Sequence, residues 1–82
     1  MPRSFFDLWV GNDVALDEDG MELPDVEAAQ QEATRALAGM ARDEIEEKIG
    51  ETTEHMAVEV RDDAGSILKV GFSFQLTRKL SS

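Results

Sequence analysis

The clearest pattern in the sequence is a strict alternation of apolar and polar residues near its C-terminal end. Apolar side chains occupy every second position from Leu68 to Leu76, and small or polar residues lie between them. Because successive side chains of a strand point to opposite faces, this pattern predicts a strand with one buried face. A second alternating run covers His55 to Arg61, and residues 62–65 between the two runs predict a tight turn.

Strand-forming residues also dominate the start of the chain, from Ser4 to Val10. They divide by position into Phe6, Leu8 and Val10, which we expect to face the core, and Phe5, Asp7 and Trp9, which we expect on the opposite face. Residues 11–13 then predict a turn, and Val14 to Asp17 a short returning strand that ends at Asp19-Gly20.

A helix is predicted between these two strand pairs. Leu23-Pro24-Asp25 favours a helix start, with Asp25 as the N-cap residue. Apolar residues then recur at helical spacing at Val26, Ala29, Ala33, Leu37 and Met40. Past Gly39 the pattern loosens, so residues 42–49 either continue this helix or form a second short one, with Gly50 as the stop. We expect residues 51–54 to be a polar connection.

The order of these elements predicts the fold class. We expect one small α+β domain over residues 1–82, with a two-layer β-β-α-β-β arrangement. Its sheet would have four strands, mostly antiparallel, with one long helix packed on one face. The other face of the sheet would be largely polar.

The charge and composition of the chain limit the classes of partner that it can bind. The chain has 82 residues and a net charge of −10, and residues 64–82 contain three basic side chains but no acidic one. This charge repels nucleic-acid phosphates and anionic lipid, so we expect neither partner, although Arg61, Lys69, Arg78 and Lys79 offer a local basic patch. Cysteine is absent, and no segment resembles a signal or a membrane span. We therefore expect a cytoplasmic protein.

The sequence contains fragments of metal and catalytic motifs, but none is complete. Aligning Gly20 with the glycine of an EF-hand loop puts Ala15 and Val26 where oxygen ligands are required, so we expect residues 17–20 to form a solvated acidic turn instead. His55 is the only histidine, so a zinc site built from histidine pairs or cysteines is excluded. Ser73 lies in a partial nucleophile-elbow pattern, but inside a predicted strand. We expect no cofactor, no metal and no catalytic residue, although the carboxylates of residues 43–54 leave acid-base chemistry as an alternative.

The outer face of the first strand is the candidate interaction surface. Phe5, Asp7 and Trp9 lie there at every second position, and two large aromatic side chains on a polar sheet face indicate a contact with a protein partner or with a second copy of the chain. The alternative is that the C-terminal tail, or the helix around Ile45 and Ile49, covers them. Edge strands offer a second route to a homodimer.

The chain also shows two family resemblances. Met1-Pro2-Arg3 before Phe5-Phe6-Asp7, then residues 17–25 and an alanine-rich helix, resemble a family of short bacterial proteins described only as a domain of unknown function. In that family the position of Ser4 is often aromatic, and the segment matching residues 43–54 is often shorter and less acidic. The chain also resembles, more weakly, the amino-terminal partner-binding domains of HicB-type antitoxins, without their DNA-binding extension.

These observations favour a non-catalytic protein-interaction or self-associating module of the bacterial cytoplasm. A carboxylate-based small-molecule binder or enzyme is the first alternative, and it requires a pocket lined by Asp or Glu with perturbed pKa values. An antitoxin-like partner-binding domain is the second.

Overall fold

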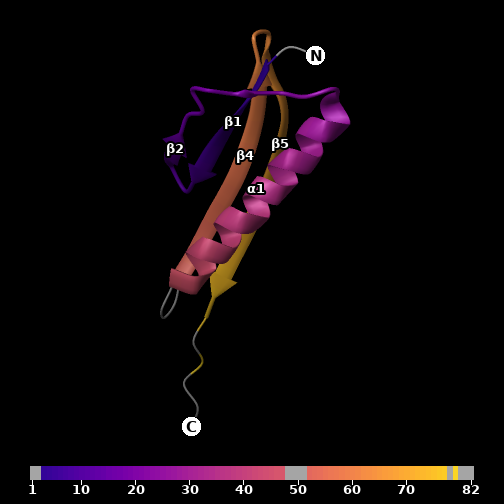
Figure 1. The fold of residues 1–82 in the computed structure, drawn as a ribbon. Helices are drawn as coiled ribbons and strands as arrows, with labels where there is room; N and C mark the ends of the chain where they lie inside the picture. Colours follow the sequence, from indigo (N-terminus) through magenta and orange to yellow (C-terminus); the bar gives the residue numbers. More distant parts are fainter. Residues whose placement is uncertain (1–2, 48–51, 78, 80–82) are drawn as a thin grey trace.

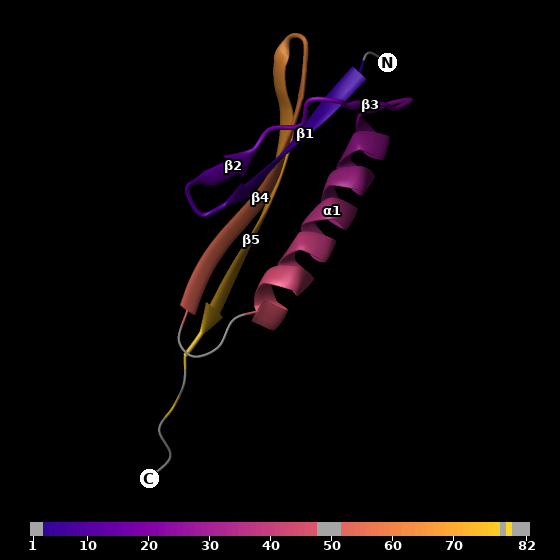
Figure 2. The same ribbon diagram turned by 60° about the vertical axis from the view of Figure 1, so that its left-hand side comes forward.

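A computed structural model describes residues 3–47, 52–77 and 79 of the chain. Within them, one antiparallel sheet of five strands lies against one long helix, which confirms the α+β class (Figure 1). Seen from the side, the helix and the sheet form two layers (Figure 2). The elements in chain order are β1 (Arg3–Val10), β2 (Asp13–Ala15), β3 (Met21–Glu22), α1 (Val26–Glu47), β4 (Thr52–Asp62) and β5 (Gly65–Leu76).

The sheet has the strand order β2-β1-β4-β5, and β3 pairs with the start of β1. Register places the predicted core residues side by side on the helix face: Phe6 is opposite Val60, and Val60 is opposite Leu68. Met56, Val58 and Val60 are fully or almost fully buried beneath α1. The division of β1, β4 and β5 into a core face and an outer face was therefore predicted correctly.

The helix begins as predicted. The carboxylate of Asp25 accepts a hydrogen bond from the backbone N–H of Ala28 at 2.8 Å, which makes Asp25 the N-cap. Ala29 and Ala33 are completely buried, and these small side chains let α1 approach β4 and β5 closely. The helix continues without a break past Gly39 to Glu47, which settles the choice for residues 42–47. The predicted stop at Gly50 lies outside the described residues.

Three strand predictions need correction. The sheet has five strands, because Met21–Glu22 forms the additional short strand β3. The returning strand β2 ends at Ala15, so Asp17 lies outside it. Strand β4 begins at Thr52, so residues 52–54 are part of the sheet and not a polar connection. Extended pairing with β5 explains this longer strand, because the register of the hairpin runs from Asp62 opposite Gly65 back to Thr52 opposite Leu76.

Candidate interaction surfaces

The predicted surface on β1 lies on the sheet face away from α1. Phe5 is opposite Arg61 of β4, and Trp9 is opposite Ala57. Phe5 and Trp9 are half-buried, whereas Asp7 between them is only 3% exposed. The three residues therefore share a face, but Asp7 is not available for a contact with another molecule.

Asp7 is held by hydrogen bonds within the chain. The Nε atom of Arg61 donates to Oδ2 of Asp7 at 2.8 Å, and the backbone N–H of Asp17 donates to Oδ1 at 3.0 Å. Arg61 also donates to the backbone carbonyl of Asp17 at 3.1 Å. A buried carboxylate requires such partners, so the role of Asp7 is to fix residues 16–20 and β4 against β1.

Residues 16–20, which connect β2 to β3, run along the edge of β1. The pairing of β1 with β2 and β3 is irregular along this edge: Leu8 pairs with Ala15, but Ser4 pairs with Met21. Five residues of this connection therefore lie beside three residues of β1, and one ladder position of β1 has no backbone partner. The carboxylate of Asp17 fills that position, because its Oδ2 accepts the backbone N–H of Phe6 at 3.1 Å.

The Asp17 carboxylate is a capping group with a lowered pKa. Partial burial acts to raise this pKa, but hydrogen bonds from the backbone N–H groups of Phe6, Gly20 and Asp19 outweigh it. The positive charge of Arg61 lowers the pKa further. We expected residues 17–20 to form a solvated acidic turn; the structure corrects this for Asp17, whereas Glu18 and Asp19 are exposed.

Phe5 and Trp9 each have a cation beside the ring. The guanidinium carbon of Arg61 lies 4.7 Å from the centroid of Phe5, and the ammonium nitrogen of Lys69 lies 5.7 Å from the ring of Trp9. Gly20 also lies against the Phe5 ring. Arg61, Lys69 and Gly20 therefore cover part of the Phe5 and Trp9 rings. Ile45 lies on the helix side of the sheet, and Ile49 lies outside the described residues.

The structure brings together two residues that the sequence left apart. The Nδ1 atom of His55 lies 2.9 Å from the hydroxyl oxygen of Ser73, across β4 and β5. A serine and a histidine at this distance resemble a nucleophile and its base. Both side chains are exposed on the open sheet face, however, and neither lines either of the two grooves described below. We interpret the contact as a cross-strand hydrogen bond.

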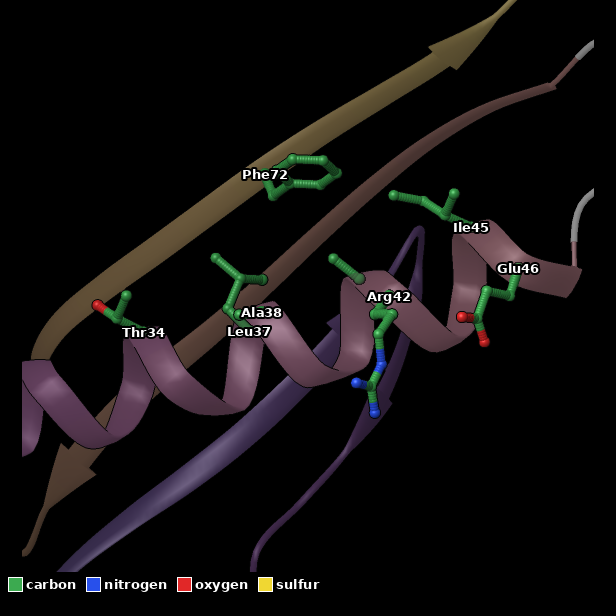
Figure 3. Close-up of a pocket in the computed structure, with 8 residues that line it drawn as sticks. Thr34, Leu37, Ala38, Arg42, Ile45, Glu46 and Phe72 are labelled. Atoms are coloured by element: carbon green, nitrogen blue, oxygen red, sulfur yellow. The ribbon is translucent and has the colours of Figure 1, made fainter.

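An apolar groove of about 620 Å³ lies on the other side of the sheet, between α1 and β5. Figure 3 shows Phe72 projecting from β5 toward the helix, and Leu37 and Ile45 projecting from α1 toward β5, whereas the polar ends of Arg42 and Glu46 point away. The remaining lining residues are Thr34, Ala38 and Ala41. Phe72 is 39% exposed, although alternation predicted it as a core residue.

A smaller groove of about 270 Å³ lies between α1 and β1, lined by Phe6, Leu8, Asp17, Met21, Glu32 and Ala36. Its two carboxylates are occupied: Asp17 caps backbone N–H groups, and Glu32 pairs with Arg35 at 2.7 Å. Over the part of the chain that the structure describes, no cluster of three or more His, Asp or Glu side chains could hold a metal ion. Among the described residues, no helix combines the length and the apolar character needed to cross a membrane.

The chain matches a known protein family over most of its length. A family model with the description "Domain of unknown function (DUF6894)" covers residues 3–75, which span all of the elements above except the last residue of β5. No curated protein and no solved structure matches the chain.

Proposed function

Since the chain belongs to this family of domains of unknown function, whose description states no activity, we propose its role from the structure itself. The protein is a non-catalytic interaction module of the bacterial cytoplasm, which binds a protein partner or a second copy of itself. Its binding surface is the groove between α1 and β5, together with the open edge of β5. The cysteine-free composition and the resemblance to short bacterial proteins support the cytoplasmic assignment.

The observation that carries this proposal is the exposure of Phe72 at an unpaired sheet edge. β5 is the last strand of the sheet order, so its outer N–H and C=O groups have no strand partner among the described residues. Beside it, Phe72, Leu37 and Ile45 form the walls of an apolar groove. Strand edges and apolar grooves are the two features that protein partners use most directly, the first for backbone hydrogen bonds and the second for anchoring side chains.

The described polar groups support a non-catalytic role. Asp7 and Arg61 form an ion pair, and the carboxylate of Asp17 accepts a hydrogen bond from the backbone of β1. A catalytic acid needs a raised pKa, whereas Asp17 has a lowered one and stays ionised near neutral pH.

The alternative of a carboxylate-based enzyme or small-molecule binder relied on the carboxylates of residues 43–54. Of these, Glu46 lines the α1–β5 groove, but its polar end points away from it (Figure 3). The groove between α1 and β1 is lined by two carboxylates, Asp17 and Glu32, and both already have partners.

Affinity capture with matched variants tests the proposal. Phe72→Glu places a charge in the α1–β5 groove, and Val14→Glu places the same charge at an equally exposed position, 40% against 39%, on the opposite edge of the sheet. Circular dichroism first establishes that both variants are folded. We expect Phe72→Glu to lose the proteins that the wild-type chain retains from its native cell, and Val14→Glu to keep them. Equal retention by both variants would refute this surface.

The face that carries Phe5 and Trp9 remains a second predicted surface. Trp9 is the only tryptophan of the chain, so its fluorescence reports on that face without interference. A partner that binds there would displace Lys69 from the indole ring and shift the emission of Trp9. An unchanged emission in a purified complex would exclude this face from the contact.

A further inference from the structure

We propose that the occupant of the β5 edge is a second copy of this chain. Two β5 strands pair antiparallel around a two-fold axis at Phe72, so that the two sheets join into one and both helices lie on the same face. This inference rests on the proposed function, because it names the partner of the same edge and groove.

The β5 edge lacks the features that keep other edges from pairing. Natural edges are usually short, charged, interrupted by proline or strongly bulged. β5 spans 12 residues, contains no proline and has Lys69 as its single charge. The opposite edge is different, because β2 and β3 are three and two residues long and the 16–20 connection separates them. Only the β5 edge therefore offers a long regular strand within the described residues.

The register of the dimer follows from the regular part of β5. The hairpin with β4 is irregular at Val60/Arg61, which leaves Leu68 to Leu76 as the uninterrupted stretch of the edge. This stretch is symmetric about Phe72, so pairing all of it with its copy puts Phe72 opposite Phe72. The other opposite pairs are then Leu68 with Leu76 and Val70 with Phe74 on the helix face, and Lys69 with Gln75 and Gly71 with Ser73 on the outer face.

Every one of these pairs is compatible. Directly opposite residues of an antiparallel pair lie on the same face, so apolar side chains meet apolar side chains and polar ones meet polar or small ones. A shift by one residue would place Val70, Phe72 and Phe74 opposite the polar set. Apolar matching therefore selects the register that puts both helices on one side.

Charge favours this edge over the rest of the surface. The chain carries a net charge of −10, so two copies repel wherever their acidic surfaces meet. None of its 18 acidic residues lies in residues 64–82, which include all of β5. In the proposed register Lys69 faces Gln75 of the second copy and not its own counterpart, so no like charges oppose each other across the seam.

Pairing would also close the groove at Phe72. Opposite side chains on antiparallel strands have Cβ atoms about 5 Å apart, so the two Phe72 rings would lie in contact at the axis. Each groove opens beside this position, with Leu37 and Ile45 on its helix wall. The exposed apolar surface of both copies is therefore buried at a single continuous seam.

Sedimentation equilibrium of the wild-type protein and two variants is the first test. We expect the wild type and Val14→Glu to have twice the 9.1 kDa chain mass, and Phe72→Glu to have the single mass. A wild type that remains at the single mass up to millimolar concentration would overturn the inference. A dimer that Val14→Glu dissociates and Phe72→Glu leaves intact would overturn it as well.

Cross-linking gives a second test that does not depend on the Phe72 variant. Because the chain has no cysteine, a single introduced thiol links only to another copy. At strand spacing and rise, two Ser73 positions lie roughly 8 Å apart in the proposed dimer, and two Ser66 positions roughly 40 Å apart. A short bis-maleimide should therefore link Ser73→Cys and not Ser66→Cys. Equal linking of the two variants would contradict the register.

The outcomes separate the two proposals. A monomeric chain whose capture of other proteins is still lost in Phe72→Glu refutes the homodimer and retains the interaction surface. A monomeric chain whose capture is unaffected by Phe72→Glu refutes both. A dimer that is linked through Ser73→Cys supports both.

Discussion

Asp7 and Arg61 are 54 positions apart in the chain, yet Nε of Arg61 donates to Oδ2 of Asp7 across 2.8 Å. The Asp7 side chain is 5% exposed and that of Arg61 37% exposed, so the carboxylate is the buried partner. The same guanidinium lies over the ring of Phe5 and bonds the backbone carbonyl of Asp17. One arginine of β4 thus joins β1, through Phe5 and Asp7, to the 16–20 connection, through Asp17.

We expect Asp7→Ala to lower the free energy of unfolding by about 2–4 kcal/mol, because it removes a buried acceptor of two hydrogen bonds and leaves a guanidinium without its anion. Urea denaturation followed by circular dichroism measures this change. The control is Glu32→Ala, which removes the exposed ion pair with Arg35 and should cost no more than about 0.5 kcal/mol. Equal losses for the two variants would show that burial of Asp7 contributes nothing.

Asp17 makes stability depend on pH in the acid range. Its folded-state pKa is lower than the unfolded value of about 3.9, so the ionised carboxylate stabilises the fold above that pH. This contribution is lost as the pH falls through the folded-state pKa. We expect Asp17→Asn to be less stable than the wild type at pH 7, with a difference that shrinks as the pH falls below about 4. Urea midpoints at several pH values test this, and a difference independent of pH would contradict it.

The predictions from sequence succeeded where the signal is local. Alternation in β5 and the Pro24-Asp25 step each specify an element through residues close in the chain, and the structure has both. β3 was missed because two residues are too few to show a period. It exists because β1 continues past β2 and leaves backbone groups that Met21–Glu22 can pair.

The candidate surface depended on information that local patterns do not contain. The alternation of side chains along β1 correctly predicted that Asp7 lies on the outer face. The burial of Asp7, however, depends on the 16–20 connection and on Arg61. Likewise, alternation placed Phe72 correctly on the helix face. Its exposure follows from the position of β5 at the end of the sheet order, which is a property of the assembled sheet.

Gly20 fixes the connection that covers Asp7 and Phe5. It has a φ of 73°, and a Cβ atom there would lie 2.7 Å from Cγ of Arg3 and 2.8 Å from Cε1 of Phe5. We expect Gly20→Ala to cost about 2–4 kcal/mol, as the sum of backbone strain and displacement of the Phe5 ring. Gly11→Ala is the control, because Gly11 has a φ of 61° and open space around it. It should cost about 1–2 kcal/mol, and thermal unfolding of both variants measures the difference. Identical costs for the two variants would mean that the Phe5 ring moves aside without a loss of stability.

Ser4 is a site where a substitution should stabilise the protein. Its side chain is completely buried on the helix side of β1, and its hydroxyl has no hydrogen-bond partner among the described residues. An unsatisfied buried hydroxyl costs about 1–3 kcal/mol, and alanine removes it without adding volume. We therefore expect Ser4→Ala to raise the free energy of unfolding by about 1 kcal/mol, measured by urea denaturation.

Ser66 provides the matched control for this substitution. It is exposed, and its hydroxyl donates to the carboxylate of Glu59 at 3.0 Å. Ser66→Ala should therefore leave stability within about 0.5 kcal/mol of the wild type, because water replaces an exposed hydrogen bond. A loss of stability in Ser4→Ala would show that the buried hydroxyl has a partner in solution. A gain of stability in Ser4→Ala and not in Ser66→Ala would show that the buried hydroxyl of Ser4 destabilises the fold.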